Sequence, residues 1–189
     1  MQTNLAYRED PREETIGGRV VMMASPGLHH IFIAGNLYAL FYAYLRGKPC
    51  TPLPDGATLF LSDEEEYRPD MMVVCDSEKL RDRGVYGAPD LVVEVLSPST
   101  ALYDKGHKKS TYEAHGVREY WLVDPNNKMI EQYLLRDGKF FLNDTYSIYP
   151  NWMLEGMRPE ERAAVKTEFQ CSLFDDLTIR LEDVFDRVP

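Results

Sequence analysis

Acidic residues interrupt two of the most hydrophobic stretches of the sequence. Asp90 opens the stretch "PDLVVEVL" and Glu94 divides it, while Asp70 opens "PDMMVV". A strand that is buried on both faces reads as a near-continuous run of Val, Leu and Ile, and an unpaired carboxylate costs several kcal/mol to bury there. Carboxylate oxygens are the ligands that Mg²⁺ prefers. The three acidic residues are therefore candidates for a metal site.

Strand geometry decides which of these carboxylates can act together. Side chains alternate along a strand, so Asp90 and Glu94 share a face, but at about 3.3 Å per residue they stand roughly 13 Å apart. Metal–oxygen bonds are about 2.0–2.6 Å long, so these two cannot easily bind one ion. Neighbouring strands lie about 4.8 Å apart. We therefore expect Asp70 and Glu94 to converge across paired strands and to bind Mg²⁺ (or Mn²⁺), because without a cation one of them would protonate.

A polar, basic segment follows the second stretch. "STALYDKGHKKSTYEAHG" predicts a helix that ends at Gly116. Lys105 and Lys109 are four residues apart, as are Lys108 and Tyr112, so the helix carries two basic stripes. The stripe that faces the sheet would bring an ammonium group to the carboxylates, where it can orient water or stabilise a developing anion. The spacing alone leaves open which lysine does so.

The remaining pattern indicates a mixed sheet with helices. Hydrophobic residues recur every three or four positions over residues 28–47, which predicts an amphipathic helix closed by Gly47. Residues 63–67 predict an acidic turn, residues 80–88 a loop, and residues 158–169 a short helix. Strands are predicted over residues 19–23, 57–62, 69–76, 90–97, 119–124, 129–135, 140–148 and 177–185. This order predicts a single α/β domain over residues 16–189, with a central mixed β-sheet flanked by helices, after a polar N-terminal arm of residues 1–15.

Composition narrows the classes of function. The 189 residues carry a net charge of -10, which argues against a general polyanion-binding surface, although a bound cation can reverse the field in one cleft. No apolar run approaches 18 residues, and the start lacks the apolar region of a signal peptide. The scattered Cys50, Cys75 and Cys171 are typical of reduced thiols. These features predict a cytoplasmic protein with no membrane span.

Other catalytic patterns find little support. Ser97 and Ser99 lie outside any G-x-S-x-G motif, and the sequence has no Walker or G-x-G-x-x-G motif. His107 and His115 lack the neighbours of a metal site and read as surface residues. The carboxylates therefore remain the leading candidates for chemistry.

Four segments together carry a resemblance to a known family. "RPDMMVV", "GAPDLVVEVLSPST", the spacing D-K-G-H-K-x-x-x-Y and "GVREYWLVDP" resemble the Uma-two family of putative bacterial restriction endonucleases, over about residues 18–124. That family is placed in the PD-(D/E)XK nuclease superfamily. The resemblance implies a restriction-endonuclease-like fold and a Mg²⁺-dependent hydrolase of DNA phosphodiester bonds. It also makes a homodimer an expectation, since nucleases that act on duplexes often use two subunits.

The resemblance also assigns roles to residues. Asp70 and Glu94 match the two acidic metal ligands, whereas the lysine position two residues after Glu94 holds Leu96. Lys108 matches the lysine that the family carries on the following helix. Tyr112, Asp90, Glu14 and His30 would support the site. The alternative is a non-catalytic nucleic-acid-binding or regulatory module on a decayed nuclease scaffold, which the net charge and Leu96 favour.

Overall fold

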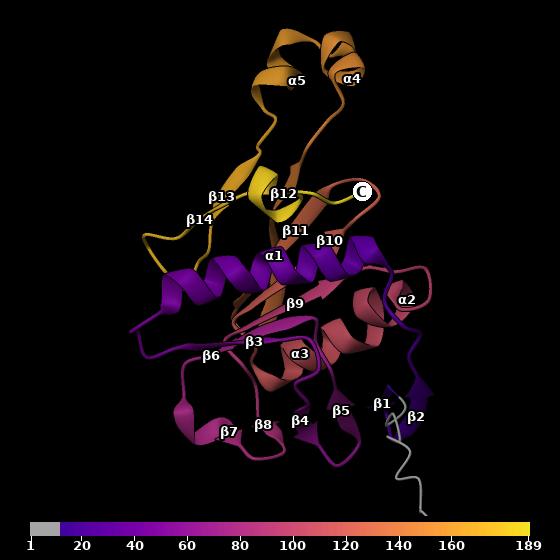
Figure 1. The fold of residues 1–189 in the computed structure, drawn as a ribbon, viewed down its shortest axis with the longest axis vertical. Helices are drawn as coiled ribbons and strands as arrows, with labels where there is room; N and C mark the ends of the chain where they lie inside the picture. Colours follow the sequence, from indigo (N-terminus) through magenta and orange to yellow (C-terminus); the bar gives the residue numbers. More distant parts are fainter. Residues whose placement is uncertain (1–11) are drawn as a thin grey trace, which may run out of the picture.

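The computed structural model describes residues 12–189 and is built around two six-stranded sheets (Figure 1). The main sheet has the strand order β12-β11-β10-β9-β6-β3, and only β9 and β10 run parallel. Its strands are β3 (Thr51–Pro54), β6 (Met71–Val74), β9 (Leu91–Val95), β10 (Glu119–Asp124), β11 (Met129–Arg136) and β12 (Lys139–Ser147). Near-continuous hydrophobic sequence in β6 and β9 matches their central, fully buried positions.

A second, more irregular sheet has the order β2-β1-β5-β4-β8-β7. Its strands are β1 (Glu13–Ile16), β2 (Arg19–Met22), β4 (Leu59–Ser62), β5 (Glu65–Tyr67), β7 (Leu80–Arg81) and β8 (Gly84–Tyr86). A third sheet pairs β13 (Glu168–Gln170) with β14 (Thr178–Arg180). The second sheet brings β1, from the start of the described chain, beside the strands that follow α1.

Helices cover both faces of the main sheet. The helical segments are α1 (Leu28–Leu45), a 3-10 turn (Ser77–Lys79), α2 (Ala101–Tyr103), a π-helical turn (Asp104–Lys108), α3 (Lys109–His115), α4 (Asn151–Gly156), α5 (Pro159–Ala163) and α6 (Leu181–Val184). The segment α2, the π turn and α3 follow each other without a break. It ends at Gly116, whose positive φ of 87° favours glycine.

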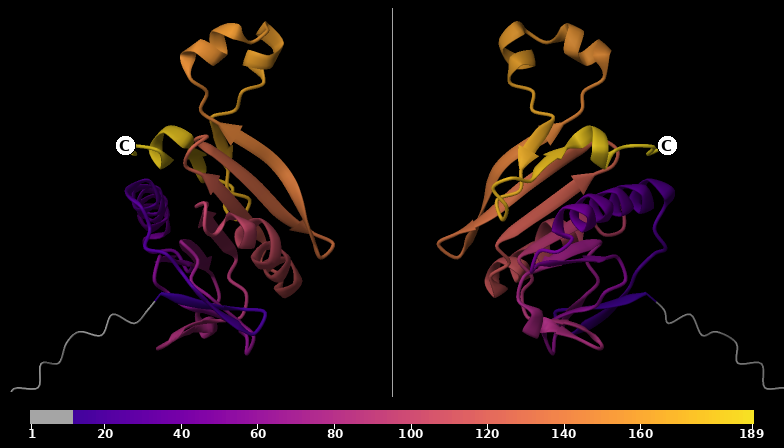
Figure 2. Two further views of the ribbon diagram at one scale, coloured as in Figure 1. Left: turned by 90° about the vertical axis from the view of Figure 1, so that its right-hand side faces the viewer. Right: turned by 60° about the vertical axis from the view of Figure 1, so that its left-hand side comes forward.

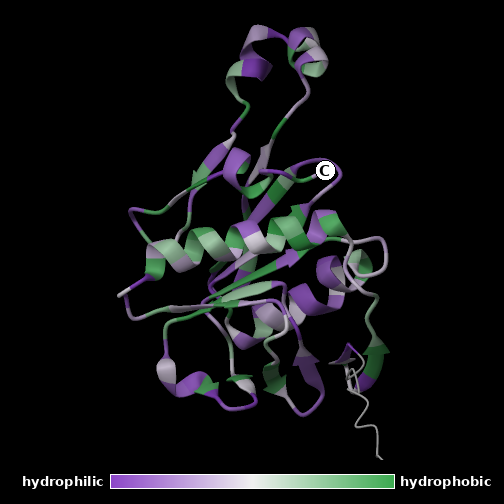
Figure 3. Cartoon of the chain, viewed as in Figure 1, coloured by the Kyte–Doolittle hydropathy of each residue, from purple (hydrophilic) through white to green (hydrophobic). Residues whose placement is uncertain are grey.

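Alternation of side chains along the strands produces two cores. On one face Met71, Val73 and Val93 pack with Ile33 and Phe41 of α1. On the other face a second cluster forms around Tyr112 of α3; this cluster includes Met72, Val74, Val92, Tyr120 and Leu122. Figure 3 shows hydrophobic residues along the central strands and hydrophilic ones along β5. The face that carries Glu94 is therefore the face covered by α3.

The predicted α/β domain with a mixed sheet is confirmed, and so is the long helix, which spans Leu28–Leu45. Several local expectations are wrong. The acidic turn over residues 63–67 contains β5, and the loop over residues 80–88 contains β7 and β8. The tail helix shortens to the five residues of α5, followed by β13, while the closing strand divides into β14 and α6. For β5, β7 and β8, pairing with neighbouring strands overrides the local sequence preference.

The polar N-terminal arm expected over residues 1–15 overlaps the second sheet. Strand β1 begins at Glu13 and pairs with β2 and β5. Residues 1–11 of that arm lie outside the described residues. The pairing of β1 matters for the site, because it fixes the position of Glu14.

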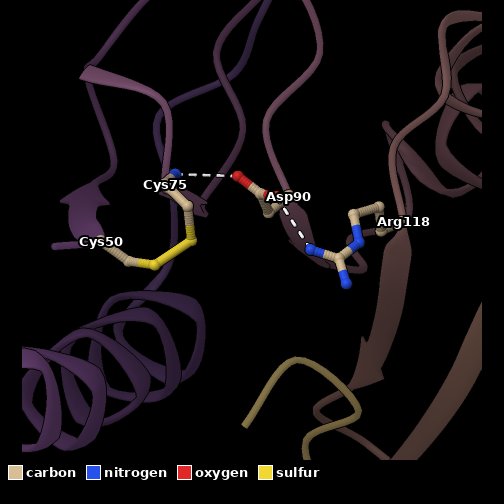
Figure 4. Close-up of a disulfide and its surroundings, with 4 residues drawn as sticks. All are labelled: Cys50, Cys75, Asp90 and Arg118. Atoms are coloured by element: carbon tan, nitrogen blue, oxygen red, sulfur yellow. Dashed lines mark hydrogen bonds and ion pairs between the residues drawn. A yellow bond between two sulfur atoms is a disulfide. The ribbon is translucent and has the colours of Figure 1, made fainter.

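The expectation of three reduced thiols is wrong for two of them. Cys50 and Cys75 form a disulfide that joins the residue before β3 to the residue after β6 (Figure 4). The two strands are neighbours in the antiparallel register, with Thr51 opposite Val74, so the flanking cysteines meet. The wide separation in sequence hid this proximity. Cys171 keeps a buried thiol.

Two further features complete the fold. Helices α4 and α5 form a lobe that projects from the body on two connecting segments, as both views of Figure 2 show. In the part of the chain that the structure describes, no helix is long and apolar enough to cross a membrane.

Candidate active site

The strand register brings Asp70 and Glu94 together at one end of the main sheet. Strands β6 and β9 pair antiparallel with Met71 opposite Val93, so continuing the register by one residue places Asp70 opposite Glu94. Asp70 Oδ2 also accepts a hydrogen bond of 2.7 Å from the backbone N–H of Val95. Both side chains are buried, as the pairing of the two hydrophobic stretches predicts.

Lys108 lies at the centre of the cluster. Its Nζ is 3.1 Å from Glu94 Oε1, 2.9 Å from Glu14 Oε1 and 3.4 Å from Asp104 Oδ1. The lysine is only 1% exposed, and all three carboxylate residues are buried as well. A charge of this kind is stable inside a protein only when it is paired and hydrogen-bonded. Lys108 therefore supplies the cluster with a cation at three carboxylates, whereas Leu96, two residues after Glu94, carries no charge.

A π-helical turn carries two members of the cluster. Asp104 and Lys108 are its first and last residues. The carbonyl oxygen of Asp104 accepts a hydrogen bond of 2.9 Å from the buried hydroxyl of Tyr120 in β10. Single π turns inside helices occur often at functional sites. Here the turn directs one acidic and one basic side chain toward Glu94.

Burial and like charges control ionisation in this cluster. Burial raises the pKa of Glu94 well above its usual range, against the lowering effect of Lys108 and with further raising by Asp104, Asp70 and Glu14. The pKa of Asp104 is also raised, chiefly by burial. Burial alone would lower the pKa of Lys108, but Glu94, Glu14 and Asp104 outweigh it and raise that pKa. Lys108 is thus an ammonium ion at neutral pH, while burial and the neighbouring carboxylates disfavour the ionised forms of Glu94 and Asp104.

Two further side chains orient the acidic pair. His30 Nε2 lies 2.7 Å from Asp70 Oδ1. The hydroxyl of Tyr112 donates a hydrogen bond of 2.7 Å to Glu94 Oε1, and burial followed by the charge of Glu94 raises the pKa of that tyrosine well above its usual range. Tyr112 is therefore a phenol donor at any working pH.

The cluster forms one wall of a cavity of about 270 Å³. Besides the acidic residues and Lys108, its wall contains Arg12, Arg68, His30 and the segments 23–27 and 97–100. Among residues 12–189, three buried side-chain atoms have no hydrogen-bond partner: Glu14 Oε2, Arg68 Nε and Asp104 Oδ1. All three belong to residues that line this cavity. Buried polar atoms are nearly always paired, so these three mark a place built to receive polar or charged groups.

The oxygen-rich donor set fits a hard divalent cation only in part. Across the described chain, no three His, Cys, Asp or Glu side chains are arranged to enclose a metal ion. Mg²⁺ does not require such a cage, because it keeps several water ligands and is often held by one or two carboxylates together with substrate phosphates. The unpartnered oxygens of Glu14 and Asp104 add acceptors beside Glu94. The residues present therefore fit Mg²⁺ or Mn²⁺ as a partly hydrated ion.

The structure brings together most of the residues singled out in the sequence. Asp70, Glu94, Lys108, Tyr112, Glu14 and His30 all belong to the cluster or contact it directly. The other two lysines of the helix point elsewhere. Lys105 pairs with Glu131 at 3.6 Å, and Lys109 lies 3.4 Å from the centroid of the Tyr133 ring.

Asp90 lies outside the cluster, at the opposite end of β9. Its carboxylate accepts a hydrogen bond of 2.8 Å from the backbone N–H of Cys75 and lies 3.3 Å from Arg118 (Figure 4). These contacts give it a structural role beside the disulfide. The strand spacing that separates Asp90 from Glu94 is confirmed by this placement.

Sequence reasoning missed several residues of the cavity, among them the charged residues Asp104 and Arg68. Asp104 was hidden in a polar helix, although its spacing of four residues from Lys108 is the spacing of facing side chains on a helix. Arg68 stands two residues before Asp70 in "YRPD". Its place in the site follows from a main-chain contact in the folded protein, which the sequence does not show. The backbone N–H of Arg68 donates to Glu14 Oε1 at 2.8 Å, which ties β1 to the segment before β6.

Comparisons with known proteins agree with this architecture. The chain is 32% identical over 133 residues to the uncharacterized protein slr1290 of Synechocystis sp., covering 69% of this chain and 70% of that one. It is 28% identical over 126 residues to sll1609 of the same organism, covering 65% and 71%. A crystal structure of a putative nuclease belonging to DUF820, from Anabaena variabilis, superposes with a TM-score of 0.68 at 17% identity, covering 93% of this chain and 90% of that one. That likeness shows a shared, restriction-endonuclease-like fold.

A family match covers most of the sequence and includes the whole cluster. Residues 2–161 match the Uma2 family, which is described as putative restriction endonuclease. The matched range contains β1, α1, the acidic pair and the π turn. The chain therefore belongs to the Uma2 family of putative restriction endonucleases.

Proposed function

We propose that the protein is a Mg²⁺-dependent endonuclease that hydrolyses phosphodiester bonds in DNA, with Asp70 and Glu94 as metal ligands and Lys108 as the positioned cation. The observation that carries the proposal is the convergence of four buried carboxylates and one buried lysine on a single cavity. Family membership supports the nuclease class. A purely structural ion pair does not need an excess of acidic groups beside a cavity.

The acidic excess supports a divalent cation. Glu94 and Asp104 have raised pKa values for which burial is the leading cause, and a divalent cation stabilises their ionised forms. When bound, Mg²⁺ polarises a phosphate oxygen and lowers the pKa of its water. Asp70 and Glu94 would hold the ion from adjacent strands, while Glu14 and Asp104 hold Lys108.

Lys108 acts as a positioned positive charge in this proposal. Because the three carboxylates raise its pKa, Lys108 stays protonated at neutral pH and does not act as a general base. It can donate hydrogen bonds to water or to an oxygen on which negative charge develops, and fixed donors of this kind commonly contribute about 10²–10³ in rate. Tyr112 keeps Glu94 Oε1 in place by its own hydrogen bond.

Nicking of supercoiled plasmid DNA tests the proposal directly. Protein freed of metal with EDTA should nick the plasmid only after Mg²⁺ or Mn²⁺ is added. Asp70→Asn and Glu94→Gln should each lower the rate by about 10²-fold or more, because each removes a ligand charge. Asp90→Asn is the matched control, since Asp90 lies at the other end of β9, and it should retain the wild-type rate.

Calorimetric titration of Mn²⁺ separates the proposal from its rival. Wild-type protein that shows neither saturable Mn²⁺ binding nor nicking would favour the non-catalytic module on a decayed scaffold. Nicking that persists in both ligand variants would point to a contaminating nuclease and would also refute the proposed site. The homodimer and the cytoplasmic location stay predictions from the sequence, and sedimentation equilibrium would test the first.

A further inference from the structure

Arg68 differs from every other cation in the wall of the cavity. Lys108 is held by three carboxylates, and Arg12 pairs with Asp55. The side chain of Arg68 forms no ion pair with any residue among 12–189, and its buried Nε has no hydrogen-bond partner there. Its backbone is nevertheless fixed, because its N–H donates to Glu14 Oε1. The chain thus holds an uncommitted guanidinium group at a defined place beside the acidic cluster.

The charges around Arg68 show which ligand it suits. Its neighbours in the cavity include Glu14, Glu94 and Asp104, which repel a phosphate group. Lys108 cannot offset that repulsion, since its own charge is already shared among three carboxylates. A phosphate that approaches the acidic cluster therefore needs a second positive group. The planar guanidinium with five donors matches phosphate oxygens better than any other side chain does.

The unpartnered atoms in the cavity are chemically complementary. Glu14 Oε2 and Asp104 Oδ1 accept no hydrogen bond, although Asp104 Oδ1 lies 3.4 Å from Lys108 Nζ, and both are acceptors that a further cation would satisfy; Arg68 Nε is a donor that an anion would satisfy. A divalent cation that carries a phosphodiester group supplies both kinds of partner at once. The cavity wall also includes the segment 97–100, whose serine and threonine hydroxyls can donate to phosphate oxygens.

We infer that Arg68 binds the phosphodiester group of the DNA substrate and positions it against the acidic cluster. This inference rests on the proposed nuclease function and adds a substrate-binding residue to it. Arg68 donates hydrogen bonds to non-bridging phosphate oxygens. It lies outside the proposed metal ligands, so its loss weakens DNA binding and leaves metal binding intact.

Arg68→Gln tests the inference through binding, without requiring cleavage. The probe is a short, fluorescein-labelled single-stranded DNA oligonucleotide, titrated by anisotropy in Ca²⁺. Arg68→Gln should raise the Kd for the oligonucleotide by about tenfold or more, because a charge-assisted contact to phosphate is lost. It should also reduce the slope of log K against log salt by about 0.7, the value for one phosphate contact on a single strand. A purely structural role for Arg68 does not change that slope.

Two more variants keep the outcome decisive. Arg68→Lys retains the charge and loses the planar fork, so it should give an intermediate Kd, and it replaces the glutamine variant if that variant fails to fold. Arg118→Gln is the matched control, because Arg118 is exposed and pairs with Asp90 away from the cavity. The control should keep the wild-type Kd and slope.

Mn²⁺ calorimetry on the same proteins separates the two proposals. Arg68→Gln should bind Mn²⁺ within threefold of the wild-type Kd. Unchanged oligonucleotide binding in Arg68→Gln and Arg68→Lys would overturn the inference and leave the nuclease proposal standing. Wild-type protein that binds Mn²⁺ but no oligonucleotide would overturn it too. Wild-type protein that binds no Mn²⁺ would refute the metal site, and the anisotropy comparison would still decide the role of Arg68.

Discussion

At the scale of single residues, the buried lysine and its acidic neighbours depend on one another. Lys108 gains little from burial itself, because desolvation opposes its charge, and the carboxylates of Glu94, Glu14 and Asp104 reverse that effect. Removing one partner of a buried charge network leaves the others uncompensated. Lys108 therefore contributes to stability as well as to the proposed function.

Lys108→Met should lower the free energy of unfolding by about 3–5 kcal/mol, because three buried carboxylates lose their cation. Urea denaturation at pH 7.5 measures the loss. The loss should shrink at pH 5, where the carboxylates protonate more readily. Lys109→Met is the control, since Lys109 lies over the Tyr133 ring on a different face, and a loss as large as that of Lys108→Met would contradict the argument.

His30 predicts a pH-dependent contribution to stability. Burial lowers its pKa, but the hydrogen bond and the charge of Asp70 together outweigh burial, so the pKa of His30 in the folded protein is raised above 6.5. A group with a raised folded pKa stabilises fully below its unfolded pKa and loses this contribution as pH rises through the folded value. In metal-free buffer, the stability difference between wild type and His30→Gln should thus be larger at pH 6 than at pH 9. A difference that grows with pH would show that the pair is not formed.

The site residues differ in how far the sequence could predict them. Asp70 and Glu94 stood out because a carboxylate in a Val-rich strand is unusual, and simple strand spacing then excluded Asp90 as the partner of Glu94. Asp104 did not stand out, because an acidic residue in a polar helix is ordinary until the fold buries it. The sequence shows the charge of a residue, whereas its burial depends on the tertiary structure.

At the scale of elements, strand β3 shows that an edge strand tolerates residues that a central strand does not. Its four residues, "TPLP", include Pro52 and Pro54, which argue against a central strand because proline cannot donate to the ladder. Among the strands of residues 12–189, β3 pairs only with β6 and forms one edge of the main sheet, where prolines are tolerated. A different reason explains the missed strand β5: its acidic residues are typical of a turn, and pairing with β1 on one side and β4 on the other makes it a strand.

The disulfide fastens this edge strand to its neighbour. Cys50 and Cys75 are separated by 25 positions in the sequence. A cross-link that closes a loop of that size lowers the conformational entropy of the unfolded chain and so stabilises the folded state by about 3 kcal/mol. The double variant Cys50→Ser with Cys75→Ser should therefore lower the free energy of unfolding by about that amount. Guanidinium denaturation measures the change. Cys171→Ser is unsuitable as a control because Cys171 is buried. The control is therefore wild-type protein measured with and without dithiothreitol. Equal free energies of unfolding in the two conditions would contradict the prediction.

At the scale of the whole molecule, the site depends on contacts between distant parts of the chain. Glu14 comes from β1 in the second sheet, His30 from α1 on one face of the main sheet, and Lys108 from the helix on the other face. The order of elements, a helix, several strands, a second helix and further strands, predicted the fold class. It could not predict a second six-stranded sheet, because short strands such as β7 and β8 are fixed by pairing more than by composition.

The lobe of α4 and α5 is a place where the chain should tolerate deletions and insertions. The two segments that enter and leave it are already joined at its base, where the backbone N–H of Ser147 donates to the carbonyl of Lys166 at 3.1 Å and Lys166 pairs with Asp144. No residue of the lobe lines the acidic cavity. Residues 149–165 thus form an insertion whose two ends are held together by contacts within the main domain. A short turn could replace the insertion, or an unrelated peptide could be inserted between its two ends, without altering the register of any strand that carries the acidic cluster.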